Sequence, residues 1–158
     1  MSTAAHEAAH TAMALRLGRA VSHVEITAGV EWRDEVLGRT MIPLLNGHYD
    51  RTDLAIRLAG YWGRLHPWPP PYERAVREDL EELCDVIADL DLDREGYEVL
   101  VAETAQMMSD PKFRRLRAAI TRLLNVAERI EGPDLERLAA AHGYPVQPEQ
   151  EQPLCSTY

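Results

Sequence analysis

The chain has 158 residues, of which 46% are hydrophobic and 27% charged, a composition typical of a globular protein with one domain and a single core. Its formal net charge of −9 argues against nucleic acid or an anionic membrane as a partner, because neutralising phosphate groups requires a basic face. No apolar run approaches the length of a bilayer span and no signal peptide precedes the first motif, so we expect a cytoplasmic protein.

The first predicted element is an alanine-rich helix over residues 3–17, which contains the sequence His6-Glu7-Ala8-Ala9-His10. This sequence fits the H-E-x-x-H pattern of zinc hydrolases. Residues four apart lie on one face of a helix, so both imidazoles can reach one metal ion, and Glu7 beside them can accept a proton from an attacking water. We therefore predict His6 and His10 as Zn²⁺ ligands and Glu7 as the catalytic base. The alternative is that these polar residues only decorate an alanine-rich helix.

Two strands and a second helix are predicted next. Residues 21–28 alternate in polarity and are rich in β-branched side chains, and residues 36–42 form a similar segment. Together they predict a small antiparallel sheet packed on the first helix. Thr52 or Asp53 can then cap a helix that runs to about Arg64.

The rest of the chain is predicted to be helical after a proline-rich segment, His66 to Pro71, that breaks regular structure. The expected helices cover residues 72–90, 94–108, 111–129 and 133–142. Residues 145–158 are polar and proline-rich, which predicts a disordered tail after a domain formed by residues 1–144. The expected fold class is α+β, mainly α, in which a helical domain carries a small antiparallel β-sheet.

A catalytic zinc ion usually has three protein ligands and one open position for water, so a third ligand is needed. The glycine and histidine that would identify a metzincin are absent, since Met13 and Arg16 occupy their positions. Glu31 and Glu35 lie near the distance at which a thermolysin-like glutamate would follow. Both belong to a predicted loop and hairpin instead of a helix, so they are weak candidates.

Asp79, in the predicted helix over residues 72–90, is a better candidate for the third ligand. It lies on the same side of that helix as the apolar stripe. A lone carboxylate that faces a core is costly unless it is paired or binds a metal. The competing interpretation is an ion pair with Arg74 or Arg77.

Several segments, taken in order, resemble the zinc peptidase domain of FtsH-type AAA proteases. The family's A-x-H-E-A-G-H-A helix, L-G-x-T hairpin, L-A-G helix and N-D-L-E stretch are similar to residues 4–11, 37–40, 58–60 and 78–81. The resemblance covers about residues 3–140. It implies an FtsH-peptidase-like fold, a zinc peptidase activity, and Asp79 as the third zinc ligand.

The chain also departs from this family. The 158 residues include no counterpart of the family's ATPase domain, and the only lysine, Lys112, follows Pro111, which excludes a Walker A phosphate loop. Residues 64–66 replace an acidic pair of the family, which leaves open which groups orient the histidines.

We therefore predict a zinc-dependent metallopeptidase that hydrolyses peptides or unfolded protein segments and is ATP-independent within this chain. Its candidate partners are a separate ATPase and further copies of itself. A substrate could add as a strand beside residues 24–28 if that strand lies at the sheet edge. The alternatives are a catalytically inactive peptidase-like binding module and a helical interaction protein in which the motif is accidental.

Overall fold

The computed structural model describes residues 2–28, 36–43, 48–62, 83 and 85–144. In chain order its elements are α1 (Thr3–Arg16), β1 (His23–Ala28), β2 (Val36–Met41), α2 (Arg51–Trp62), α4 (Arg94–Ser109), α5 (Pro111–Ala127), β3 (Arg129–Glu131) and α6 (Gly132–Ala141). Residues 85–89 are also helical. The predicted fold class, α+β and mainly α, is confirmed. The segment 66–71, Asp79 and the tail 145–158 lie outside the described residues.

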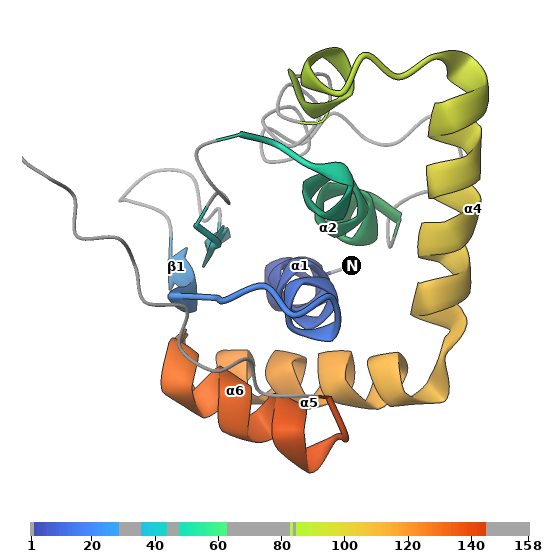
Figure 1. Ribbon diagram of the computed structural model, residues 1–158. Coiled ribbons are helices and arrows are strands. Elements are labelled where there is room, and N and C mark those ends of the chain that lie inside the picture. Colours follow the sequence, from blue (N-terminus) through green and yellow to red (C-terminus); the bar gives the residue numbers. More distant parts are fainter. Residues whose placement is uncertain (1, 29–35, 44–47, 63–82, 84, 145–158) are drawn as a thin grey trace, which may run out of the picture.

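Helix α1 lies in the middle of the molecule. It is covered by α2 on one side, by α5 on the opposite side and by the sheet on a third (Figure 1). Every residue from 6 to 15 is buried. A helix that is buried all round must carry side chains small enough for its neighbours to approach, and alanine supplies this along most of α1. The motif therefore lies in the interior of the protein.

The sheet has three antiparallel strands in the order β2-β1-β3. Val24 on β1 is opposite Thr40 on β2 and opposite Ile130 on β3. The hairpin of β1 and β2 was predicted, but β3 was not, because residues up to 129 were expected to continue the preceding helix. That helix ends at Ala127, where Glu128 adopts a left-handed conformation with φ of 60°. A strand of only three residues gives no periodic signal.

The position of β1 corrects one expectation about the substrate. Pairing of a peptide with residues 24–28 required that segment to lie at the sheet edge. Instead β1 has a neighbour on each side, and the amide of Ile26 also donates to the carbonyl of Glu128. Within the described part of the chain β2 pairs only with β1.

Helix α2 links two apolar clusters. Ile56 and Ala59 belong to the core around α1. Leu54 and Leu58 belong to a second cluster, in which they pack with Leu83, Val86 and, on α4, Leu100. The end of the predicted helix 72–90 is therefore helical and packs on α2. No helix among the described residues is long and apolar enough to cross a membrane.

Candidate metal centre

The two motif histidines lie side by side on α1 in the interior. His6 is 3% exposed and His10 is 5% exposed. Their rings are nearly perpendicular, with centroids 4.6 Å apart, and the two Nε2 atoms are 3.2 Å apart. The helical spacing predicted from the sequence therefore brings the same nitrogen atom of both rings to one point.

The other nitrogen of each ring contacts the backbone of α2. Nδ1 of His6 is 3.0 Å from the carbonyl oxygen of Gly60, and Nδ1 of His10 is 2.8 Å from the carbonyl oxygen of Ile56. A carbonyl oxygen can only accept a hydrogen bond, so each Nδ1 must carry the proton and donate it. Backbone atoms of α2 thus fix the orientation and the tautomer of both rings, a task that acidic side chains often perform at metal sites.

This tautomer has an electrostatic consequence at the Nε2 atoms. A neutral imidazole that is protonated on Nδ1 has a lone pair on Nε2. The two Nε2 atoms lie 3.2 Å apart, so a proton or a metal ion between them could be shared by both nitrogens.

Gly60 is the point where α2 comes closest to the histidines. A Cβ atom built on Gly60 would lie 2.0 Å from Nε2 of His10 and 2.2 Å from its Cε1. No side chain fits there while the ring keeps its place. Glycine inside a helix costs roughly 1 kcal/mol relative to alanine, and this close approach explains why α2 carries one.

Glu7 is part of α1, its side chain contacts β2, and it is 6% exposed. Its Oε2 accepts a hydrogen bond of 2.7 Å from Oγ1 of Thr40, and its main-chain carbonyl accepts one of 2.8 Å from Oγ1 of Thr11. A Cβ atom on Gly38 would lie 2.3 Å from Cγ of Glu7, so this strand position also requires glycine. The burial of Glu7, His6 and His10 is inconsistent with a motif that only decorates a surface helix.

The predicted third ligand lies outside the part of the chain that the structure describes, as do Glu31 and Glu35. Within the described residues, no group of three or more His, Cys, Asp or Glu side chains is arranged to hold a metal ion. His6 and His10 are thus brought together as predicted, whereas the Glu7 side chain contacts Thr40 and Gly38 of β2. Asp79 stays a prediction.

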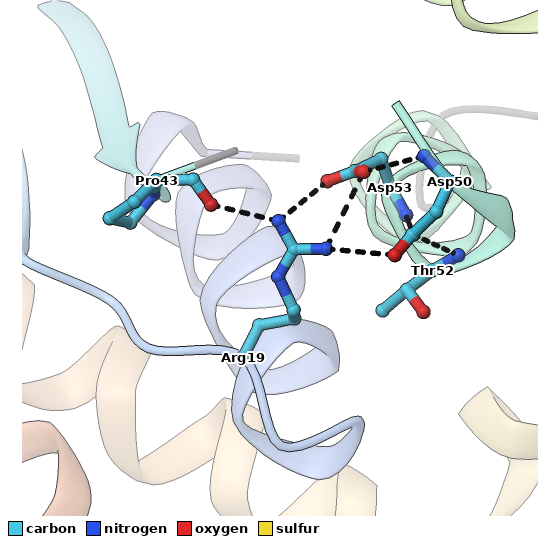
Figure 2. A network of polar contacts seen from close by, with 5 residues as sticks. All are labelled: Arg19, Pro43, Asp50, Thr52 and Asp53. Atoms are coloured by element: carbon cyan, nitrogen blue, oxygen red, sulfur yellow. Dashed lines mark hydrogen bonds and ion pairs between the residues drawn. The ribbon is translucent and has the colours of Figure 1, made fainter. Parts of the chain in front are cut away.

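A partly buried ion cluster links the start of α2 to the segments that follow α1 and β2 (Figure 2). The Arg19 guanidinium donates to the carbonyl oxygen of Pro43 at 2.8 Å and contacts both Asp53 at 3.2 Å and Asp50 at 3.3 Å. Asp50 also accepts hydrogen bonds from the amides of Thr52 and Asp53. The prediction that Thr52 or Asp53 caps this helix was therefore wrong. The capping side chain is that of Asp50, two or three residues earlier.

The two carboxyl groups of this cluster differ in acidity. Burial raises the pKa of Asp53 above its ordinary value, and the nearby Asp50 carboxylate adds to that effect. Burial acts in the same direction on Asp50, but the amides of Asp53 and Thr52 and the charge on Arg19 together lower the pKa of Asp50. The charge on Arg19 lowers the pKa of both carboxyl groups and so opposes their mutual repulsion.

Replacing Arg19 by methionine is expected to lower the free energy of unfolding by about 3–5 kcal/mol, the cost of leaving a buried charge without its partner. Arg19 and Asp53 have side chains that are only 9% and 7% exposed. Urea denaturation followed by circular dichroism measures the change. Arg94→Met is the matched control: its ion pair with Glu98 is exposed, so a loss below about 0.5 kcal/mol is expected. Equal losses in both variants would contradict the role given to Arg19.

Sequence reasoning missed the groups that hold the motif in place. These are the carbonyl groups of Ile56 and Gly60, the hydroxyl group of Thr40 and the space left by Gly38. The available signal was a glycine inside a predicted strand and another inside a predicted helix, which often marks a close approach of backbone to another group. No model of a known protein family matches the chain, and no curated protein matches its sequence.

Proposed function

We propose that the protein is a zinc-dependent metallopeptidase that resembles the FtsH peptidase domain, with His6, His10 and Asp79 as metal ligands and Glu7 as general base. The observation that carries this proposal is the pair of Nε2 atoms 3.2 Å apart, each on a ring whose Nδ1 donates to a backbone carbonyl. Two nitrogen atoms bound to one tetrahedral zinc at about 2.0–2.1 Å lie about 3.3 Å apart. The spacing of the two histidines therefore supports a shared zinc ion.

The position of Asp79 in the sequence supports it as third ligand. Asp79 comes four residues before Leu83 and seven before Val86, and both of these side chains are buried against α2. In a helix these spacings predict one common face. On this pattern Asp79 belongs to the same face of the predicted helix 72–90 as Leu83 and Val86, and on this face a carboxylate needs a partner or a metal ion.

A zinc ion held by these residues would supply Lewis-acid activation of water and of the scissile carbonyl group. The chain's own contribution is a buried base, Glu7. Glu7 accepts a proton from the attacking water and then delivers it to the leaving amine, which is general acid–base catalysis by a single carboxylate. The carbonyl groups of Ile56 and Gly60 hold both rings by Nδ1 and so leave both Nε2 atoms to bind the proposed metal ion.

The substrate class we propose is a peptide or an unfolded protein segment in the cytoplasm. Thr40 and Gly38 place β2 directly beside Glu7. An extended peptide paired with the outer edge of β2 would bring its backbone close to the base while making little demand on its sequence. The only lysine of the chain is Lys112, so nucleotide-driven unfolding would require a separate ATPase as partner.

A peptidase-like binding module without turnover is the alternative function. The replacement of the family's acidic pair by residues 64–66 favours it. The buried Glu7 argues against it, because a purely structural metal site has no use for a base beside its two histidines.

Metal analysis of purified protein tests the proposal. After incubation with Zn²⁺ and removal of free metal, we expect about one zinc ion per chain in the wild type and a large loss in Asp79→Ala. Asp85→Ala is the matched control, since Asp85 is exposed on the described end of the same predicted helix. A wild type that binds no zinc would overturn the metal site. Full zinc content in Asp79→Ala would remove only Asp79 from it.

A further inference from the structure

The hydroxyl group of Thr40 is aimed at the carboxylate of Glu7. Oγ1 of Thr40 lies 2.7 Å from Oε2 of Glu7, the length of a charge-assisted hydrogen bond. An ionised carboxylate can only accept, so the hydroxyl proton must point toward it. Glu7 is 6% exposed, which leaves little water to compete for this bond.

Thr11 leaves the Thr40 proton available for the carboxylate. Oγ1 of Thr40 is also 3.3 Å from the main-chain oxygen of Glu7, so two acceptors compete for its single proton. The hydroxyl group of Thr11 donates to that main-chain oxygen at 2.8 Å. Each hydroxyl group thus has its own acceptor on Glu7.

Gly38 and Thr40 act on Glu7 from the same face of β2. Residues two apart in a strand project to one side of the sheet. The first of the two leaves a gap, since any Cβ there would lie 2.7 Å from Oε1 of Glu7. The second provides a donor for Oε2. On β2, therefore, Gly38 leaves room for Oε1 of Glu7 and Thr40 donates a hydrogen bond to Oε2.

We propose that Thr40 is a positioning residue for the general base: its hydroxyl group fixes the rotamer of Glu7 so that the carboxylate faces the attacking water. This inference rests on the proposed peptidase function. A base must lie within hydrogen-bond reach of the proton that it removes. A displacement of about 1 Å at such a group can lower the rate about 100-fold.

Steady-state kinetics on a fluorogenic peptide provides the first test. Thr40→Val removes the hydroxyl group and keeps the shape of the side chain. We expect kcat to fall about 10–100-fold, with KM and zinc content unchanged, because positioning affects the transition state and not the ground state. Thr40→Ser restores the donor and is expected to restore most of kcat. Thr121→Val, which removes a hydroxyl group bonded to the carbonyl of Arg117 on α5, is expected to match the wild type.

A second readout needs no activity. NMR relaxation of the Glu7 side-chain carbons in the purified, folded protein reports how well the carboxylate is ordered. We expect an ordered Glu7 in the wild type, Thr40→Ser and Thr121→Val, and a mobile one in Thr40→Val. An ordered Glu7 or an unchanged kcat in Thr40→Val would overturn the positioning role. A wild type that binds zinc and hydrolyses no peptide, but whose Glu7 becomes mobile in Thr40→Val, would overturn the peptidase function and keep the positioning role.

Discussion

Glu7→Gln is expected to abolish measurable peptide hydrolysis and to leave the zinc content at the wild-type value. Glutamine has the same size as glutamate, and its carbonyl oxygen can still accept the hydrogen bond that Thr40 donates to Oε2. What the amide cannot do is accept the proton of the attacking water. General-base catalysis contributes typically about 10²–10⁴-fold to a rate, so we expect kcat to fall by at least 100-fold.

The measurement pairs hydrolysis of an unstructured protein or peptide with metal analysis of the same preparation. Glu98→Gln serves as control, because Glu98 is exposed on α4, where it forms an ion pair with Arg94. Hydrolysis that survives in Glu7→Gln would remove Glu7 from the mechanism. A wild type that holds zinc and hydrolyses nothing would instead favour the inactive binding module.

The helix that carries the motif could be predicted because its signal is local. Alanine has the highest helix propensity, and the spacing of His6 and His10 is visible in the sequence. The start of α5 could be predicted in the same way, since Pro111 occupies its first position after the capping side chain of Asp110. In these segments each residue and its structural partner lie within one or two helical turns.

The environment of the motif could not be predicted because its parts are far apart in the chain. The carbonyl groups of Gly60 and Ile56 are 54 and 46 residues from the histidines that they orient. A backbone carbonyl has no sequence signature, so an expectation built on acidic side chains could not find it. The same holds for Thr40, which is 33 residues from Glu7. Only the packing of α2 and β2 on α1 brings these groups together.

The burial of the motif also depends on this packing. The sequence alone left open whether the histidines face solvent, because an alanine-rich helix can lie on a surface or in a core. Because α1 packs against α2, α5 and the sheet, the side chains of His6, Glu7 and His10 lie in the interior. Buried groups must be paired. The burial of these polar side chains gives the metal interpretation a physical basis that the H-E-x-x-H pattern alone does not provide.

Two glycine-to-alanine substitutions are expected to separate metal binding from catalysis. Gly60→Ala would place a methyl group 2.0 Å from Nε2 of His10. In an unconstrained helix this change stabilises the protein by roughly 0.4–1 kcal/mol. Here either the imidazole or α2 has to move, and both movements break the hydrogen bonds that aim the Nε2 lone pairs. We expect zinc affinity to fall by about 10–100-fold, the range found when groups that orient metal ligands are lost.

Gly38→Ala is the matched comparison, because it adds the same methyl group on the other side of α1. That methyl group would lie 2.3 Å from Cγ of Glu7, so the base is displaced and the histidines are not. We expect zinc affinity close to that of the wild type and a kcat about 100-fold lower. Competition with a chromophoric chelator measures the affinity, and peptide hydrolysis measures kcat. If Gly60→Ala kept its zinc affinity, or if both variants lost it equally, the histidines and Glu7 would not have the separate tasks that their contacts with α2 and β2 assign to them.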